Sequence, residues 1–500
     1  MKNLLVCTAT LIVLFLHQSS MAQDCNNCRY ISPMFDSVMV ETIHFGEGMN
    51  IDGDLQQLYA DVYQPYGDTA SNRPVIIFAF GGGFVQGSRT DWYVREVCEH
   101  FAKAGYVAVA NDYRLGIDPL EILFLQHMRI FFRPMQDMRA TVQYLKADFS
   151  ELGNSFRIDT SNIFLGGASA GAISALMTEY CNRPEEMAEM GNMDALDELG
   201  GFYATSGFYP QYDWNVAAVV NVAGALVNAA WVEPGDVPIV SAHGDQDNIV
   251  PYGYGPFGGG ALGGFFDLQG SSIVHQEAVN EGVCSYLFTM EGHDHPNEGM
   301  GIEYIKSVVH RIGQRVYAVL NDRSFCCELG VDVTPNDTLF TSVLMEAVQL
   351  QAELTNDNGN AALQWCSVPC WVDASDPALN VLPDTSWKYI SLIATEGACQ
   401  ASDLYILMNG QPSSIVELQP NGTLSMHPIP ASDLVNLSFQ GLGGASDVQV
   451  HIFNPEGKRM LSTPVQNHIT LNVSDWAAGV YLVQTTDGRT LVSSHKLVVQ

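Results

Sequence analysis

Between residues 71 and 312, short apolar segments alternate with longer segments of helical spacing. Val75 to Phe80 is a continuous apolar run followed by three glycines, as expected for a parallel strand buried on both faces. Helices are also expected over Asp91 to Ala104, Met135 to Lys146 and Ala170 to Tyr180, and strands over Tyr106 to Ala110, Asn162 to Gly166, Val216 to Val222, Val237 to Ala242 and Ser285 to Met290. This alternation predicts an α/β fold, in which helices flank a mostly parallel sheet.

After about Ser324 the pattern changes, because helical spacing disappears and short strands separated by turn residues replace it. Such strands are expected at Val348 to Leu354, Ala362 to Trp365, Trp387 to Ile393, Leu404 to Met408, Val448 to Phe453, Ile469 to Val473 and Val480 to Gln484. Pro420-Asn421-Gly422 marks a turn or linker. The sequence therefore predicts an N-terminal leader over residues 1–22, an α/β domain over 23–322, a small β-sandwich over 323–412 and a second sandwich-like module over 421–500.

The chain is strongly acidic, with 55 acidic and 22 basic residues and a net charge of −33. An acidic surface repels nucleic acids and anionic membranes, so neither class of partner is expected. Hydrophobic residues make up 47% of the chain and charged residues 15%, which is the composition of a packed globular protein rather than a disordered one.

The N-terminus has the features of a secretory signal peptide. Lys2 supplies the positive charge, Leu4 to Leu16 form an apolar core too short to span a bilayer, and Ser20-Met21-Ala22 provides the small residues of a cleavage site. The mature chain is therefore expected to begin near Gln23, with no stable membrane span. A retained membrane anchor is the alternative.

Of the 11 cysteines, ten remain after Cys7 is removed with the leader. In an exported protein these residues are disulfide candidates. Cys25-x-x-Cys28 is alternatively a metal or redox pair, but no second pair stands at zinc-finger spacing. The pairing of the cysteines does not follow from the sequence.

Gly167-Ala168-Ser169-Ala170-Gly171 lies between a predicted strand and a predicted helix. A G-x-S-x-G sequence in this position forms a nucleophile elbow, in which Gly167 and Gly171 allow a tight turn that exposes the serine hydroxyl. The N-terminus of the following helix also favours negative charge. Ser169 is therefore the candidate nucleophile, and a structural serine in an inactive protein of the same fold is the alternative.

A glycine run, Gly81-Gly82-Gly83, directly follows the predicted strand that ends at Phe80. Glycines leave backbone N–H groups free to face an oxyanion. The N–H groups of Gly82, Gly83 and Ala170 are therefore candidates for an oxyanion hole. A flexible turn without this role is the alternative.

Carboxylates and imidazoles follow the last two predicted strands of the α/β region. Asp245 and Asp247 come after one strand, and His293 and His295 come after the next. A carboxylate can orient an imidazole that acts as general base, and the order Ser, Asp, His is that of α/β-hydrolases. No metal site is expected, because alternate residues such as His293 and His295 would point apart on a strand.

These motifs resemble those of carboxylesterases and lipases of the α/β-hydrolase superfamily, and the similarity runs from about Leu58 to Ile312. Leu58 to Pro65 resembles an early strand of that fold, and Asn111 to Leu115 matches its D-Y-R-L segment. In that family the acid is the second Asp of H-G-x-x-D and the base follows a glycine. The resemblance therefore implies Asp247 and His293, with Asp245 and His295 as alternatives. One departure is Phe80, where relatives usually carry His.

The end of the chain resembles the C-terminal sorting domain of type IX secretion substrates in Gram-negative bacteria. The matching segments are Pro428 to Asp433, Asn454 to Lys458, Gly479 to Val483 and Lys496 to Val499, with Ile429 where Asn is usual. Residues 350–403 loosely resemble an immunoglobulin-like or PKD-like module. The resemblance implies export to the cell surface or the medium by the type IX machinery, and an ordinary β accessory domain is the alternative.

The sequence as a whole predicts a secreted serine esterase that forms an acyl-enzyme with a small-molecule or polymer-linked carboxylic ester. No cofactor or metal is expected. The segments Arg183 to Trp214 and Gly253 to Gly264 are candidates for a lid or for pocket walls. A serine peptidase on the same fold and a non-catalytic surface binding or adhesion protein are the alternatives.

Overall fold

The computed structural model describes residues 28–117, 128–191, 193–258, 266–296 and 302–327, and beyond these the strands of residues 329–499 without most of the loops that join them. The predicted leader over residues 1–22, Cys25 and the turn at Pro420-Asn421-Gly422 lie outside the described residues. The chain divides into two compact units. The first consists of Met1–Leu339, Ala347–Leu382 and Trp387–Leu407, and the second of Phe340–Glu346, Pro383–Ser386 and Met408–Gln500.

The largest element of the first unit is an eight-stranded sheet. Its strand order is β1 (Val38–Met49), β2 (Leu55–Pro65), β4 (Val107–Asn111), β3 (Arg73–Ala79), β5 (Ile158–Ala168), β6 (Ala218–Val222), β8 (Ile239–Gly244) and β11 (Ser285–Met290). β2 runs antiparallel to both of its neighbours, β1 and β4, and the strands from β4 to β11 are parallel. This is the α/β-hydrolase fold, and it confirms the predicted fold class.

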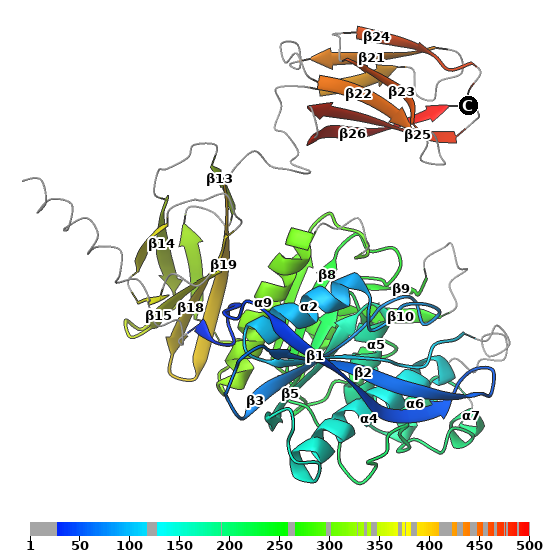
Figure 1. Ribbon diagram of the computed structural model, residues 1–500, viewed down its shortest axis with the longest axis vertical. Helices are drawn as coiled ribbons and strands as arrows, with labels where there is room; N and C mark the ends of the chain where they lie inside the picture. The colour runs from blue at the N-terminus through cyan, green and yellow to red at the C-terminus, as the bar shows by residue number, and fades with distance from the viewer. Residues whose placement is uncertain are drawn as a thin grey trace, which may run out of the picture. The chain divides into compact units, whose positions relative to one another are not determined.

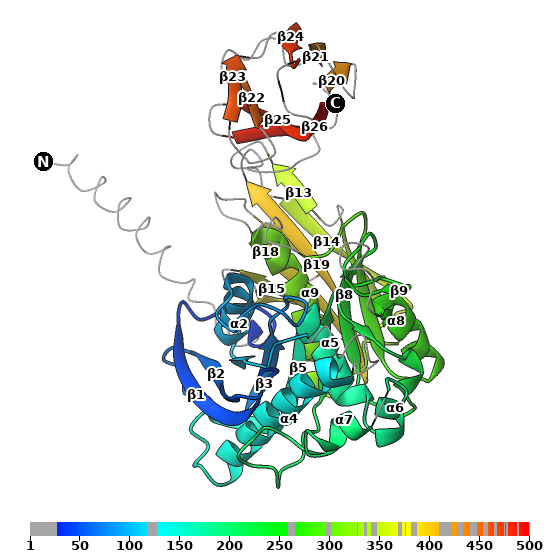
Figure 2. The ribbon, with the colours of Figure 1, turned by 90° about the vertical axis from the view of Figure 1, so that its right-hand side faces the viewer.

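Helices cover both faces of this sheet (Figures 1 and 2). On one face, α2 (Trp92–Lys103) packs against α9 (Ile302–Leu320). On the other face, α4 (Met128–Ser150) packs against α5 (Ala170–Tyr180), and α8 (Ser271–Asn280) lies over β8 and β11. The strands are therefore buried from both sides, which explains why several of them are continuous apolar runs.

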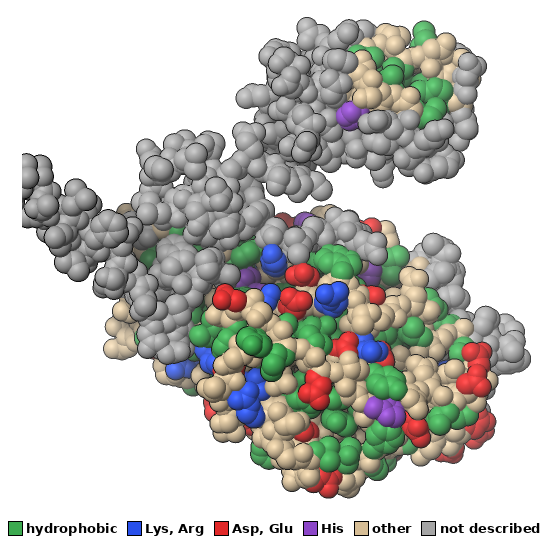
Figure 3. All heavy atoms as spheres, in the orientation of Figure 1, with side chains coloured by type: hydrophobic (Ala, Val, Ile, Leu, Met, Phe, Trp, Pro, Cys, Tyr) green, Lys and Arg blue, Asp and Glu red, His purple; other side chains and the backbone are tan. Residues whose placement is uncertain are grey.

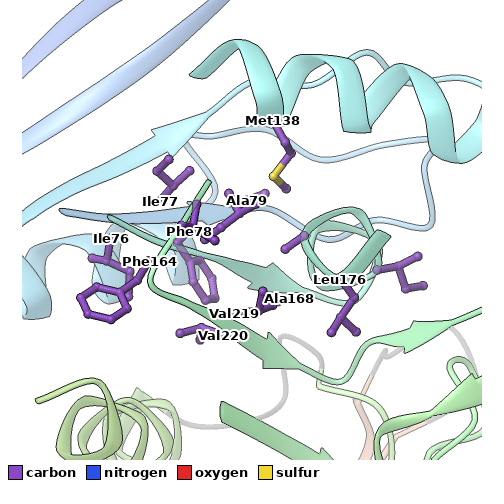
Figure 4. Close-up of a cluster of buried hydrophobic side chains, with 14 of the residues drawn as sticks. Ile76, Ile77, Phe78, Ala79, Met138, Phe164, Ala168, Leu176, Val219 and Val220 are labelled. Atoms are coloured by element: carbon purple, nitrogen blue, oxygen red, sulfur yellow. The ribbon is translucent and has the colours of Figure 1, made fainter. Parts of the chain in front are cut away.

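The core between strands and helices is closely packed (Figure 4). Ile76 of β3, Phe164 of β5 and Val219 of β6 are fully buried, as are Met138 of α4 and Leu176 of α5. Truncating such a side chain to alanine typically costs about 2–5 kcal/mol. This packing fixes the strands whose carboxyl ends carry the candidate site.

Helix α4 departs from the sequence prediction, because it begins at Met128 rather than Met135 and continues through Pro134. A proline inside a helix removes one backbone hydrogen bond and normally ends the helix. The added turns bury Ile130 and Phe131 in the core. We attribute the longer helix to this burial, which offsets the cost of the proline.

Residues 330–409 form two antiparallel sheets with a common apolar core. One sheet consists of β12 (Gly330–Thr334), β14 (Val348–Thr355) and β17 (Ala378–Val381), and the other of β13 (Thr338–Thr341), β19 (Cys399–Asn409), β18 (Lys388–Glu396), β15 (Ala362–Val368) and β16 (Asp373–Ala374). Trp365 and Tyr405 are fully buried in this core. The immunoglobulin-like or PKD-like character of the module stays a prediction.

Several bonds join this β module to the α/β region within the first unit. Cys28 forms a disulfide with Cys366 of β15, which bears out the expectation that the cysteines pair. Gln314 of α9 donates from Nε2 to the Asp403 carbonyl at 2.8 Å, and Gln400 of β19 donates from Nε2 to the Gln314 carbonyl at 3.0 Å. The β module is therefore anchored on α9.

The second unit contains two antiparallel sheets of its own. Their strand orders are β20 (Thr423–His427), β21 (Leu434–Gln440), β24 (His468–Asn472), and β23 (Arg459–Pro464), β22 (Val448–Phe453), β25 (Gly479–Asp487), β26 (Thr490–Val499). Val435, Val450 and Val483 lie in its small core.

The acidic residues of the first unit are not gathered in one patch on the face seen in Figure 3. Acidic side chains are scattered there among basic and apolar ones. Among the described residues, no helix is both long and apolar enough to cross a bilayer.

A half-buried histidine, His100, and a buried one, His310, lie where α2, α9 and β18 meet. The rings of His100 and His310 are 4.4 Å apart, and His310 stacks on Tyr389 of β18 at 4.6 Å. Burial, with the nearby charges of Lys306 and Lys103, lowers the pKa of His100 to about 3. Burial also lowers the pKa of His310 well below its usual value. Both imidazoles are therefore neutral in the folded protein near neutral pH.

We predict that this packing makes the folded protein acid-sensitive. The pKa of each histidine is lower in the folded state than in the unfolded state, so the unfolded chain binds the extra protons. Stability is then fully present above about pH 6.5 and falls below it, by roughly 1.4 kcal/mol per pH unit for each imidazole. His310→Phe should reduce the loss of unfolding free energy between pH 7 and pH 5, measured by chemical denaturation. An unchanged pH dependence would contradict the prediction.

Candidate active site

Ser169 occupies the turn between β5 and α5, where the sequence predicts a nucleophile elbow. Its φ of 54° and ψ of −120° lie in a region that residues other than glycine rarely adopt. The Ser169 N–H donates to the Val222 carbonyl at 2.8 Å, and the Ser169 carbonyl accepts from the Ile173 N–H at 2.9 Å. The strained turn is thus held by the end of β6 and by the first turn of α5.

The two glycines of the elbow are required by close packing. A Cβ atom on Gly167 would lie 2.6 Å from the Gly171 carbonyl carbon, and one on Gly171 would lie 2.5 Å from the carbonyl oxygens of Ala79 and Phe80. Such distances are well below van der Waals contact. The G-x-S-x-G pattern therefore reflects the approach of α5 to β3.

Three segments that are far apart in the chain meet at this turn. His295 Nε2 lies 2.9 Å from Ser169 Oγ, and His295 Nδ1 lies 2.6 Å from Asp247 Oδ2. Asp247 follows β8 and His295 follows β11, and both strands are parallel to the strand that leads to Ser169. The carboxyl ends of the three strands lie at one edge of the sheet, which brings the side chains together.

The Asp247 carboxylate is buried and fully hydrogen-bonded. Oδ1 accepts from the N–H groups of Ile249 and Val250, both at 2.9 Å, and Oδ2 faces His243 Nε2 at 3.1 Å as well as His295. Burial alone would raise the pKa of Asp247, but the hydrogen bonds from His243 and His295 outweigh it and hold the pKa well below its usual range. Asp247 is therefore ionised near neutral pH.

The charge of Asp247 determines how the His295 ring is protonated. An ionised carboxylate only accepts hydrogen bonds, so His295 Nδ1 must carry its hydrogen. In the neutral ring Nε2 then has a free lone pair, and this atom faces Ser169 Oγ. The arrangement can therefore receive a proton from the Ser169 hydroxyl.

The imidazole that contacts Ser169 belongs to His295, which was the alternative to His293. His293 is exposed, and its Nδ1 lies 2.8 Å from the carbonyl of Glu291 in its own loop. The His293 carbonyl accepts from the Gln246 N–H at 3.0 Å. The first residues after β11 thus dock the loop on the neighbouring segment, and the chain reaches Ser169 two residues later than the family pattern implies.

The competing carboxylate, Asp245, has a different partner. Its Oδ1 accepts from the Gly292 N–H at 2.6 Å. Asp294 likewise accepts from the backbone and side-chain N–H groups of Asn248, at 3.1 and 2.9 Å. These carboxylates hold the two loops of the site together, and Asp247 is the one that contacts the imidazole.

The glycine loop lies directly against Ser169. A Cβ atom built on Gly81 would be 3.1 Å from Ser169 Cβ. Gly82 and Gly83 follow with positive φ angles of 117° and 62°. Within the described part of the chain, the N–H groups of Gly82, Gly83 and Ala170 have no hydrogen-bond acceptor. The Gly81 backbone thus lies against Ser169, and the three predicted oxyanion donors are unpaired among the described residues.

Phe80, which stands where relatives usually carry His, is a core residue. Its ring is buried and stacks on Tyr113 with 4.2 Å between centroids, and its carbonyl accepts from Tyr113 Oη at 2.9 Å. On the other side of the same peptide, the Gly81 N–H donates to Tyr93 Oη at 2.6 Å. Two tyrosines therefore hold the loop at this position.

Sequence reasoning missed two residues of this site. His243 at the end of β8 is buried, and it contacts Asp247 from four positions upstream. The H-G-x-x-D pattern was a signal for it. Tyr93 had no signal, because it lies on α2, outside every motif of the family. Across the described residues, no group of three or more His, Cys, Asp or Glu side chains could hold a metal ion.

The candidate lid segment Arg183 to Trp214 contains the short helices α6 (Pro184–Ala188) and α7 (Asp194–Asp197). Its later part is tied to β1, where the Glu47 N–H donates to the Ser206 carbonyl at 2.8 Å. Part of Gly253 to Gly264 lies outside the described residues. The role of both segments stays a prediction.

Two family models match parts of this chain. Residues 60–229 match the family model described as BD-FAE, and residues 425–500 match the model of a Secretion system C-terminal sorting domain. Esterase LipC of Mycobacterium tuberculosis is 30% identical over 166 residues, which are 32% of this chain and 36% of that protein. The chain therefore spans about a third of the length of this relative.

Similar solved structures include esterases from bacteria. The propionate-bound esterase 2 of Thermogutta terrifontis aligns at 19% identity with a TM-score of 0.39, covering 56% of this chain and 94% of that one. A truncated carbohydrate esterase from gut microbiota aligns at 17% identity with a TM-score of 0.38, covering 57% and 99%. The chain therefore has an α/β-hydrolase fold, is similar to an esterase over 166 residues, and matches a secretion sorting domain at residues 425–500.

Proposed function

We propose that this chain is a secreted serine esterase, with Ser169 as nucleophile and His295 as general base and acid. Asp247 orients the imidazole and stabilises its positive charge. The observation that carries the proposal is the continuous hydrogen-bonded line from Ser169 Oγ through His295 to Asp247 Oδ2. A nucleophile with an adjacent base, itself oriented by a third group, is the arrangement used for acyl transfer.

The first half of the reaction forms an acyl-enzyme. His295 Nε2 removes the proton of Ser169 as Oγ bonds to the ester carbonyl carbon, and Asp247 stabilises the imidazolium that results. The carbonyl oxygen becomes an oxyanion, which the N–H groups of Gly82, Gly83 and Ala170 accommodate. The imidazolium then protonates the leaving alcohol, and the carbon–oxygen bond to that alcohol breaks.

The second half releases the acid. A water molecule attacks the acyl carbon while His295 removes its proton, and a second oxyanion forms in the same place. When this intermediate collapses, His295 returns the proton to Ser169 and the carboxylic acid departs. The cycle needs only groups of this chain and water.

The sorting domain at residues 425–500 supports a proposal for where the enzyme acts. The sorting domain indicates export to the cell surface or the medium, with the type IX secretion machinery as partner. We propose that the ester is carried by a small molecule or by an extracellular polymer. The predicted signal peptide over residues 1–22 belongs to the same proposal.

We predict that Ser169→Ala abolishes hydrolysis of p-nitrophenyl acetate and labelling by a fluorophosphonate probe, because both need the same nucleophile. Circular dichroism should show that the variant is folded. An amide substrate of matched acyl group separates esterase from peptidase activity. Turnover that survives the substitution would refute the proposal.

We predict that His295→Ala lowers kcat for the same ester by at least about 10³-fold, since Ser169 loses its base. His293→Ala is the matched control, because this residue is two positions away and exposed. Its kcat should stay within about threefold of the unsubstituted enzyme. Equal losses in the two variants, or the larger loss in His293→Ala, would contradict the assignment.

A further inference from the structure

The Gly81 peptide has an unusual anchor beside the nucleophile. Its N–H donates to Tyr93 Oη at 2.6 Å, so the phenol oxygen acts there as an acceptor. Burial raises the pKa of Tyr93 to about 12, so the hydroxyl keeps its hydrogen at neutral pH. Because that hydrogen is not used toward Gly81, it is available to another acceptor.

The Tyr93 hydroxyl and Ser169 lie on the same side of Gly81. A Cβ atom built on Gly81 would be 3.1 Å from Ser169 Cβ and 3.4 Å from Tyr93 Oη. The phenol, which α2 carries, therefore lies near the Ser169 side chain and next to the loop that supplies Gly82 and Gly83.

We propose that the Tyr93 hydroxyl is a further hydrogen-bond donor to the ester carbonyl oxygen as it becomes an oxyanion at Ser169. This proposal rests on the proposed esterase function and adds a side-chain donor to the backbone donors of the site. The bond from the Gly81 N–H orients the phenol and polarises its O–H group, which strengthens the bond that the hydroxyl donates.

The hydrogen bond from the Tyr93 hydroxyl should speed up the chemical step rather than strengthen substrate binding. A hydrogen bond to an oxyanion is stronger than one to a neutral carbonyl oxygen, so the Tyr93 hydroxyl stabilises the transition state more than the bound ester. Loss of a single oxyanion donor costs about 10²–10³ in kcat in well-studied cases.

Tyr93→Phe tests this role, because it removes the hydroxyl and keeps the ring. We expect kcat for p-nitrophenyl acetate to fall by about 10- to 100-fold with KM within about twofold. The inhibition constant of a boronic acid, which forms a tetrahedral anion on the nucleophile, should rise in parallel with the loss of kcat/KM. Tyr113→Phe is the control, since Tyr113 Oη holds the other side of the same peptide and, among the described residues, bonds only to the Phe80 carbonyl.

The outcomes separate this inference from the function on which it rests. If the unsubstituted enzyme neither hydrolyses esters nor reacts with a fluorophosphonate, the proposed function itself fails. If it does both and Tyr93→Phe is as active, the donor role is wrong. Equal losses in Tyr93→Phe and Tyr113→Phe, with unchanged boronic acid inhibition, would show that the tyrosines only anchor the loop.

A separate observation concerns the consecutive residues Cys326 and Cys327. Cys326 forms a disulfide with Cys284, at the start of β11. Cys327 Sγ lies 3.4 Å from the Ser324 carbonyl, and Ser324 pairs with Cys399 of β19 in an isolated β-bridge. Cys327 and Cys399 both pack against the apolar core of the β module, and a hydrogen bond from Cys327 raises the pKa of the Cys399 thiol to about 11.

We infer that Cys327 and Cys399 form a further disulfide in the exported protein. The two thiols lose two protons and two electrons to the disulfide of a thiol–disulfide oxidoreductase, which is reduced to a dithiol, and the sulfur–sulfur bond forms. The adjacent cysteines would then bond to different elements, one to β11 and one to β19. The segment between Cys284 and Cys326, which carries His295, would be fixed to the β module.

Peptide mapping of the secreted protein tests this pairing. After alkylation of free thiols and digestion without reductant, we expect one cluster of three peptides that contain Cys284, Cys326-Cys327 and Cys399. Cys399→Ser should release the third peptide and leave the Cys284–Cys326 bond intact. Buried Cys98 should be alkylated after denaturation in both proteins, as an internal control. Alkylated Cys327 and Cys399 in the unsubstituted protein would overturn the inference.

Discussion

The contact between Asp247 and His295 is the constraint on which the rest of the site depends. Asp247 is kept ionised inside the protein by four hydrogen-bonded partners, and that charge decides which nitrogen of His295 carries the hydrogen. The contact exists only if the segments after β8 and β11 approach the turn after β5. The parallel order of these strands is therefore needed to assemble the site as well as to stabilise the fold.

The site combines strain with tight packing. Ser169 has a backbone conformation that costs free energy, and the surrounding strands and helix α5 hold it there. Gly167 and Gly171 let α5 approach β3, while Tyr93 and Tyr113 hold the glycine loop from opposite sides. A preorganised site of this kind needs little rearrangement when charge develops on the substrate.

Sequence reasoning predicted correctly those features of the fold that depend on local sequence patterns. The alternating segments predicted an α/β fold with a mostly parallel sheet, the family resemblance implied the α/β-hydrolase fold, and the glycine-flanked serine lies at the predicted turn. It failed where tertiary packing decides. The His293 carbonyl bonds to the neighbouring loop, and His295 is the residue that contacts Ser169. Tyr93 contacts the glycine loop from a helix that carries no recognisable motif. Helix α4 continues through Pro134 because burial of Ile130 and Phe131 in the core stabilises the helix by more than the internal proline destabilises it.

The most direct test of this account is to trap the acyl group. Rapid acid quenching of the enzyme during turnover of p-nitrophenyl acetate, followed by peptide mass spectrometry, identifies the residue that carries it. The account predicts one acetyl group per chain, on the peptide with Ser169 and on its hydroxyl. Turnover without acetylated Ser169, or with the acetyl group on another residue, would contradict it.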